Sequence, residues 1–286
     1  MLPLVAAVVF AALIVASGGL FEPDDSTPGD LAVGGQKGSS PLITGHVHGI
    51  ARHPDRGDVY VATHDGLFVI TGSAPPRFVG PAIDLMGFTI TKSGDLLASG
   101  HPGVGTDLPQ PVGLIESVDG GKSWAVRSRG GQSDFHALSA SAGGVVGYDG
   151  TLRASDDGSS WRTLSSPPEV MSLGASPDGV HLLAATGAGL QSSSTAGKAW
   201  ALVPGAPALV LVDWADDNQV VGADRAGAVF SSGDAGRTWE RAPAKALGPP
   251  QALSASIQDG RVEILAVTHA AILRSSDGGS AFTPLG

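Results

Sequence analysis

The chain has 286 residues, a net charge of −10 and no cysteine. The lack of cysteine excludes disulfides, thiolate metal sites and a cysteine nucleophile, and the 17 Lys and Arg residues of an acidic chain argue against nucleic acid as a partner. With 42 Gly, 20 Pro and 15% charged residues, the composition is typical of many short strands joined by tight turns, and of neither a helical bundle nor a disordered protein.

The N-terminus begins with an uncharged apolar run, MLPLVAAVVFAALIVASGG, and Glu22 is the first charged residue. A run of this length predicts a signal peptide or a membrane anchor over residues 1–19. Residues 20–43 are rich in Pro, Gly, Ser and Asp and predict a flexible linker. We therefore expect residues 44–286 to be extracytoplasmic, either secreted or anchored to a membrane through the N-terminal segment alone.

The folded part opens with HGIARHPDRGDVYVATHDGL, in which a short strand, a turn and a second strand follow one another. Five related stretches follow along the chain: MGFTITKSGDLLAS, HALSASAGGVVGYDGT, MSLGASPDGVHLLAATGAGL, WADDNQVVGADRAG and ALSASIQDGRVEILAVTHAAI. Each stretch supplies two strands. A further turn separates one stretch from the next, with one strand before it and one after it, so the pattern predicts units of four strands.

A second motif repeats between these stretches. It is clearest in SVDGGKSW (117–124), SGDAGRTW (232–239) and SSDGGSAF (275–282), and weaker in SDDGSSW (155–161) and SSTAGKAW (193–200). The central positions 119, 157, 195, 234 and 277 are spaced by 38, 38, 39 and 43 residues. A period of about forty residues with four strands per unit indicates a β-propeller. Residues 45–80 form a further unit without the motif, so we expect six blades.

The motif S-x-D-x-G-x-x-W resembles the Asp-box, or BNR repeat, of sialidase-like and glycosyl-hydrolase-like propellers, which also occurs in sortilin-type receptors and photosystem II assembly factors. The resemblance implies a structural role for Asp119, Asp157, Asp234 and Asp277, because a short acceptor side chain holds the backbone N–H groups of a turn and Gly supplies positive φ. The predicted fold is therefore all-β: a six-bladed β-propeller with four-stranded antiparallel blades, preceded by an N-terminal apolar segment.

The first strand of each blade of a propeller lines the central channel. When the blades are aligned on the turn after this strand, histidines, methionines and carboxylates fall at equivalent positions near its start. Seven residues before the turn lie His48, Met86, His136, Met171, Val210 and Ala252. Two residues further back lie His46, Asp84, Asp134, Glu169, Ala208 and Pro250. The connection between the second and third strands returns to the same face and contributes His64, His101, Tyr148 and His269. We expect the insertion GHPGVGTDLPQPVG to fold over this mouth of the channel.

Imidazole and thioether groups without thiols suit copper, Cu(I) in particular, and imidazole alone also suits zinc. The sequence thus predicts a transition-metal site formed by some of His46, His48, His64, Met86, His101 and His136. Tyr148, Met171 and His269 are secondary candidates. Asp84, Asp134 and Glu169 either bind the metal or orient the imidazole rings.

Four alternatives to a metal site stay open. The mouth could be a water-filled polar channel or the pocket of an organic ligand, or the protein could be a scaffold that binds another protein. The resemblance to sialidases implies glycoside hydrolysis, but the aligned positions lack the three arginines of that family. Asp84, Asp134 and Glu169 remain as candidates for hydrolysis by paired carboxylates. If the protein is an enzyme, we expect a glycosyl hydrolase of the BNR class or a metal-dependent oxidoreductase, since no motif indicates a nucleotide cofactor.

Overall fold

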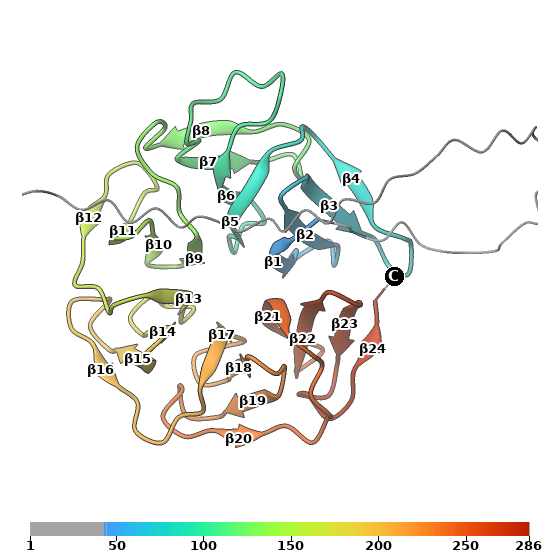
Figure 1. Ribbon diagram of the computed structural model, residues 1–286, viewed down its shortest axis with the longest axis vertical. Helices are drawn as coiled ribbons and strands as arrows, with labels where there is room; N and C mark the ends of the chain where they lie inside the picture. The colour runs from blue at the N-terminus through green and yellow to red at the C-terminus, as the bar shows by residue number, and fades with distance from the viewer. Residues whose placement is uncertain (1–42, 44, 286) are drawn as a thin grey trace, which may run out of the picture. The chain divides into compact units, whose positions relative to one another are not determined.

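The computed structural model describes residue 43 and residues 45–285. Six four-stranded antiparallel sheets surround a central channel, so the predicted six-bladed β-propeller is confirmed (Figure 1). Within the described residues, no helix is long and apolar enough to cross a membrane. The predicted segment 1–19 and nearly all of the predicted linker lie outside the described residues, and the two boundaries between the three predicted segments stay predictions.

Each blade is built from four consecutive strands. Blade 1 contains β1 (Val47–Arg52), β2 (Val59–Thr63), β3 (Gly66–Ile70) and β4 (Arg77–Val79). Blade 2 contains β5 (Asp84–Ile90), β6 (Leu96–His101), β7 (Leu114–Ser117) and β8 (Ala125–Ser128). Blade 3 contains β9 (Ala137–Ser141), β10 (Gly144–Tyr148), β11 (Leu152–Ser155) and β12 (Arg162–Thr163).

The second half of the chain repeats this plan. Blade 4 contains β13 (Val170–Ala175), β14 (Leu182–Thr186), β15 (Gly189–Ser193) and β16 (Ala201–Leu202). Blade 5 contains β17 (Leu209–Trp214), β18 (Val220–Asp224), β19 (Val229–Ser232) and β20 (Glu240–Arg241). Blade 6 contains β21 (Pro250–Gln258), β22 (Arg261–Thr268), β23 (Ile272–Ser275) and β24 (Thr283–Pro284).

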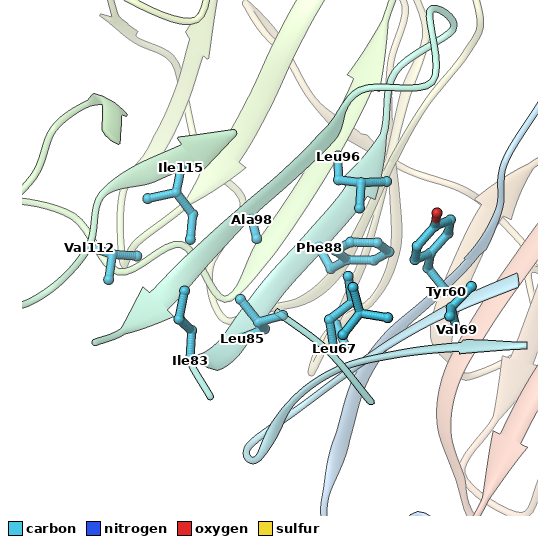
Figure 2. Close-up of a cluster of buried hydrophobic side chains, with 12 residues drawn as sticks. Tyr60, Leu67, Val69, Ile83, Leu85, Phe88, Leu96, Ala98, Val112 and Ile115 are labelled. Atoms are coloured by element: carbon cyan, nitrogen blue, oxygen red, sulfur yellow. The ribbon is translucent and has the colours of Figure 1, made fainter. Parts of the chain in front are cut away.

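The hydrophobic core lies between neighbouring blades. At the junction of blades 1 and 2, Leu67 packs in one cluster with Leu85 and Leu96, and all three are almost fully buried (Figure 2). Both faces of the inner strands are covered by neighbouring blades, which explains the continuous apolar runs of β2 and β14. Burial between blades therefore fixes the angular position of each first strand around the channel.

The repeated motif forms the turn between the third and fourth strands. Ser117 Oγ donates to Asp119 Oδ1 at 2.8 Å and accepts from the buried Gly121 N at 2.8 Å, while Ser123 N donates to Asp119 Oδ1 at 3.0 Å. Hydrogen bonds from the Ser123 side chain and backbone lower the pKa of Asp119 to about 2. Equivalent bonds surround Asp157, Asp234 and Asp277. The carboxylates therefore hold these turns by accepting hydrogen bonds from the turn residues.

The first strand carries a β-bulge in five blades. The unpaired residue of the bulge is His48, Met86, Met171, Val210 or Gln251. The position predicted for blade 6, Ala252, is therefore wrong by one residue, because the hairpin of β21 and β22 is longer than those of the other blades. A bulge redirects one side chain relative to the regular pleat. Five blades therefore redirect the equivalent side chain at the channel mouth.

The insertion after His101 differs from the expectation. In Figure 1 it extends outward from blade 2, beyond β7 and β8, instead of across the channel. Leu108 packs against the core of blades 1 and 2, and Pro109 lies against Gly130 beside β8. Pro111 alone lines a pocket at the mouth, next to His136. The insertion therefore does not cover the mouth.

Candidate metal centre

Two imidazoles face each other at the mouth of the channel on blade 1. His48 occupies the bulge of β1, and His64 follows the end of β2. Their Nε2 atoms lie 3.2 Å apart, and the ring centroids are 4.4 Å apart at an interplanar angle of 84°. Adjacent antiparallel strands thus bring together two ring nitrogens that are sixteen positions apart in the sequence.

Asp84 of the neighbouring blade holds the second ring. Its Oδ1 lies 2.7 Å from His64 Nδ1, which places the proton of a neutral His64 on Nδ1. The Nε2 lone pair of His64 is then free, and it can accept the Nε2–H of His48. A carboxylate that fixes the tautomer and orientation of a histidine in this way is the usual second neighbour of a metal-binding imidazole.

The His48 ring is neutral at physiological pH. Burial, followed by the charges of His64 and His46, lowers the pKa of His48 to about 4. A metal ion therefore does not have to displace an ionising proton from this ligand near pH 7.

His46 is the third imidazole of this group. Its ring stacks on His48 with the centroids 4.8 Å apart, and its carbonyl oxygen accepts a hydrogen bond from His64 N at 3.2 Å. The backbone position of His46 is thus fixed while its side chain is exposed. Rotation about its side-chain bonds can bring a third nitrogen toward the pair.

Gln251 was not found from the sequence. Its Oε1 accepts a hydrogen bond from Val47 N at 3.2 Å, and its Nε2 lies 2.8 Å from His269 Nδ1. Blade 6 therefore supports the start of β1 through this glutamine, and His269 contacts it instead of the other imidazoles. The only signal in the sequence is the bulge position, which the alignment missed by one residue.

A second group lies between blades 2 and 3. Asp134 Oδ2 lies 3.1 Å from His101 Nε2 and 2.9 Å from His136 Nε2. The hydrogen bond that His136 donates to the Asp134 carboxylate raises the pKa of His136. The other oxygen of Asp134 is buried without a hydrogen-bond partner within the described chain.

The two groups differ in what they can bind. Among the described residues, the single set of three ligand atoms within 4.8 Å of one another belongs to His48, His64 and Asp84. His101 and His136 sit on the two sides of one carboxylate oxygen and form no such set. The six predicted metal ligands thus separate into a compact group on blade 1 and a more open pair, with Met86 half-buried at the bulge of β5 between them.

The remaining candidates are spread around the mouth. Met171 is 42% exposed and lines a cavity of about 130 Å³ in the channel together with His48 and His136. Glu169 has a φ of 53° and lies beside Gly187, where an added Cβ would meet its Oε2. Tyr148 borders a pocket with Asp134 and His136. None of these residues belongs to the compact group.

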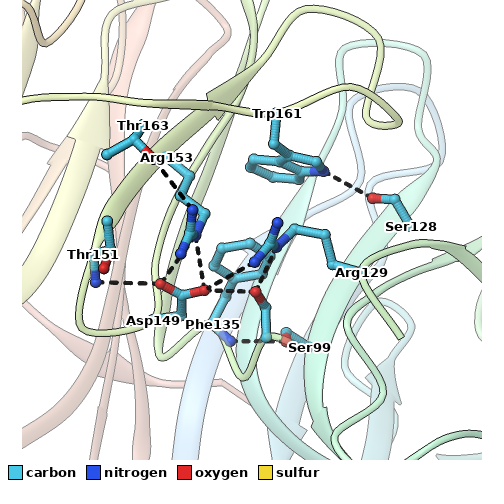
Figure 3. A network of polar contacts seen from close by, with 10 residues as sticks. Ser99, Ser128, Arg129, Phe135, Asp149, Thr151, Arg153, Trp161 and Thr163 are labelled. Atoms are coloured by element: carbon cyan, nitrogen blue, oxygen red, sulfur yellow. Dashed lines mark hydrogen bonds and ion pairs between the residues drawn. The ribbon is translucent and has the colours of Figure 1, made fainter. Parts of the chain in front are cut away.

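A polar network beneath the second group also escaped sequence analysis. Asp149 accepts bonds from Arg153 Nε at 3.0 Å and Ser133 Oγ at 2.5 Å, and Arg129 Nε donates to Ser133 Oγ at 2.5 Å (Figure 3). Arg129 has the unusual φ of 57°. The network holds the segment that leads into Asp134, and nothing in the local sequence of these distant residues indicates it.

No protein-family model matches the chain, and no curated protein matches it in sequence. Several solved structures are similar in fold. A GH74 xyloglucanase from Xanthomonas campestris is 16% identical with a TM-score of 0.52, over 85% of this chain and 38% of that chain. YCF48 bound to D1 peptide is 16% identical with a TM-score of 0.54, over 85% of this chain and 82% of that one.

A catalytically inactive virginiamycin B lyase from Staphylococcus aureus, solved with quinupristin, is 12% identical with a TM-score of 0.55, over 86% of this chain and 85% of that one. At these identities the comparisons show a shared fold. This chain spans 38% of the length of the xyloglucanase. Fold and site together define a six-bladed β-propeller with a possible His/His/Asp metal-binding group at one mouth of its channel.

Proposed function

We propose that the protein is a metal-handling β-propeller that binds a transition-metal ion between His48 and His64. The observation that carries this proposal is the 3.2 Å separation of the two Nε2 atoms, with the His64 ring held from behind by Asp84. Metal–imidazole bonds of about 2.0–2.1 Å in a tetrahedral site place two nitrogens roughly 3.3 Å apart. The separation of the two nitrogens therefore already matches that of a tetrahedral site.

The coordination sphere is completed from the same mouth. His46 supplies a third imidazole, which leaves the fourth position for a water molecule or an exchangeable ligand. Asp84 acts as the positioning residue because its oxygen already accepts the His64 Nδ1–H. The same logic assigns Asp134 to the orientation of His101 and His136.

Copper is the favoured ion and zinc the second choice. The support for copper is the combination of imidazoles with Met86 at the equivalent bulge of the adjacent blade, since thioethers select Cu(I). The net charge of −10 favours attraction of cations over anionic substrates.

The wider assignment rests on the turns and the N-terminus. The Ser–Asp–Gly hydrogen bonds of the repeated turns support membership of the Asp-box (BNR) class. The apolar run over residues 1–19 supports an extracytoplasmic protein that is secreted or membrane-anchored.

Two other functions have less support. Glycoside hydrolysis would need Asp84 and Asp134 as acid and base, yet each already accepts a hydrogen bond from histidine. Protein binding is compatible with the metal site, as YCF48 holds a peptide on a similar fold, but no described feature of this chain specifies a protein partner.

The proposal is tested by titrating the chain, purified without a polyhistidine tag and stripped of metal, with Cu(I), Cu(II) and Zn(II). We expect one ion per chain, and loss of that ion in the double variant His48→Ala/His64→Ala. The matched control His101→Ala/His136→Ala removes two mouth imidazoles outside the compact group and should keep the ion. Absence of binding in the unaltered chain, or equal loss in both double variants, would reject the proposed site.

A further inference from the structure

A second cavity lies between blades 4 and 5, on the side of the molecule that carries the repeated turns. Its volume is about 400 Å³, within the range of small-molecule sites. It is lined by Trp200, Leu202 and Val203, which belong to or flank β16, together with Trp214 of β17 and Arg237 of the next turn. The cavity shares no residue with the candidate metal centre.

The same junction is closed between blades 2 and 3. There Arg127 Nη2 donates to Asp157 O at 2.8 Å, and Ser128 Oγ donates to Gly158 O at 2.7 Å. These two side chains bridge the last strand of one blade to the turn of the next.

Blade 4 lacks both bridging side chains. Counting from the motif tryptophan, Arg127 and Ser128 of WAVRS correspond to Val203 and Pro204 of WALVP. Neither Val203 nor Pro204 has a side-chain donor, so the turn of blade 5 has no such bridge, and Arg237 Nη1 donates to Asp234 O within its own turn at 3.1 Å. Val203 and Pro204 themselves line the cavity.

The blade 4 turn that lines the cavity also differs from the other motif turns in charge. Thr195 stands where four of the five motifs have Asp, and its hydroxyl performs the backbone role by accepting from Ala199 N at 3.0 Å. The turn of blade 4 therefore contributes no carboxylate to the cavity, which Arg237 and His181 also line, whereas the turn of blade 5 keeps Asp234, whose Oδ1 accepts from Arg237 N at 3.0 Å. An anion therefore meets one carboxylate fewer here than it would between two turns that both carry Asp.

The walls are apolar and partly open to solvent. Leu202 is 54% exposed, whereas Leu183 and Trp214 are 1% and 6% exposed. A ligand that covered Leu202 and the Trp200 face would remove apolar surface from water.

We propose that this cavity binds a small amphipathic anion, an aromatic or branched aliphatic carboxylate or sulfonate. Its apolar part lies against Trp200, Leu202 and Val203, and its charged group pairs with the Arg237 guanidinium. Arginine suits this role because its planar fork matches the oxygens of a carboxylate.

The test uses 8-anilinonaphthalene-1-sulfonate, a fluorescent amphipathic anion, titrated into the full chain. We expect saturable binding with one site. Val203→Arg, which introduces the arginine that blade 2 has at this position, should abolish binding of the probe. Arg237→Gln should weaken that binding at least fivefold. Arg162→Gln, at an exposed arginine of another blade, is the matched control and should leave binding unchanged.

Competition with a charged and a neutral ligand distinguishes recognition of the anionic group from nonspecific hydrophobic binding. Indole-3-acetate should displace the probe at least tenfold better than the neutral indole-3-acetamide. Each variant is accepted only with a melting temperature close to that of the unaltered chain, and Arg237→Gln keeps the test valid if Val203→Arg does not fold. Unchanged binding in folded Arg237→Gln, equal displacement by the two indoles, or no saturable binding would overturn the proposal.

Discussion

At the scale of single residues, the candidate metal centre depends on which nitrogen of His64 carries the proton. Asp84 takes the Nδ1–H at 2.7 Å and so directs Nε2 toward His48. Burial and neighbouring imidazoles keep His48 neutral. The orientation of the two histidines therefore depends on the hydrogen bond that His64 donates to Asp84 of the adjacent blade.

Asp84→Asn should weaken metal binding by about 10- to 100-fold, the usual cost of losing a carboxylate that orients a ligand histidine. The amide no longer enforces the Nδ1–H tautomer of His64. Isothermal titration of the apo chain measures the change, and Asp107→Asn, at an exposed aspartate of the insertion, should bind as the unaltered chain does. Equal affinities for Asp84→Asn and the unaltered chain would show that Asp84 does not position His64.

Asp213, which lines the channel cavity, makes stability depend on pH. Burial raises its pKa to about 6, although Asp213 Oδ2 accepts a bond from Ala255 N at 2.8 Å. Because the folded state binds this proton more tightly than the unfolded state, the contribution of Asp213 to stability grows as pH falls from about 6 toward 4.

Asp213→Asn keeps an acceptor for Ala255 N and removes the buried charge. It should raise the free energy of unfolding by roughly 2–3 kcal/mol at pH 7.5, at about 1.4 kcal/mol per pKa unit, and should make little difference near pH 4. Urea unfolding at both pH values checks this. A variant that is less stable at pH 7.5 would mean that the charged carboxylate is needed.

At the scale of elements, the repeated turns and the bulged first strands have different origins. The turns are local: Ser, Asp and Gly within five positions satisfy one another, so their spacing in the sequence predicts them. The bulges depend on the register between two strands, which flanking residues do not specify. For this reason the sequence predicted the blade period but misplaced the channel residue of blade 6.

The same distinction explains the candidate site. The two-residue spacing of His46 and His48, and the equivalent positions of His64 and His101 on successive blades, place the imidazoles at one mouth from the sequence alone. Which imidazoles contact Asp84 and which contact Asp134 depends on side-chain rotamers and on the ring nitrogen that faces each carboxylate. A pattern of residue types does not specify rotamers or ring orientation.

Ser117→Ala tests how far one turn stabilises its blade. The change leaves the buried Gly121 N–H without its acceptor, which should lower the free energy of unfolding by about 1–3 kcal/mol. Chemical unfolding measures it, with Ser123→Ala at the exposed side of the same turn expected to cost less. If Ser117→Ala cost nothing, the turn would be held by its backbone alone.

At the scale of the whole molecule, the ring closes without strand exchange, because every blade consists of consecutive strands. Blades 6 and 1 are joined instead by side chains. Glu263, 1% exposed, accepts from Arg52 Nη2 at 3.0 Å and from Arg274 Nε at 2.5 Å. Near the mouth, the Gln251–Val47 bond joins the same two blades.

Glu263→Gln should therefore destabilise the whole propeller. It removes the carboxylate charge that pairs with the largely buried Arg52 guanidinium, and breaking a buried ion pair costs about 3–5 kcal/mol. Differential unfolding in urea measures the loss, and Asp156→Asn, which breaks the exposed pair with Arg162, should change stability by less than about 1 kcal/mol. Similar small effects of both changes would mean that packing alone closes the ring.

The central claim is that a metal ion binds between the Nε2 atoms of His48 and His64, and anomalous diffraction from crystals of the zinc- or copper-loaded protein tests it most directly. We predict one strong anomalous peak within about 2.0–2.2 Å of both Nε2 atoms, with Asp84 still bonded to His64 Nδ1. A peak on His101 or His136 alone, or no peak at the mouth in crystals soaked at saturating metal, would contradict the account.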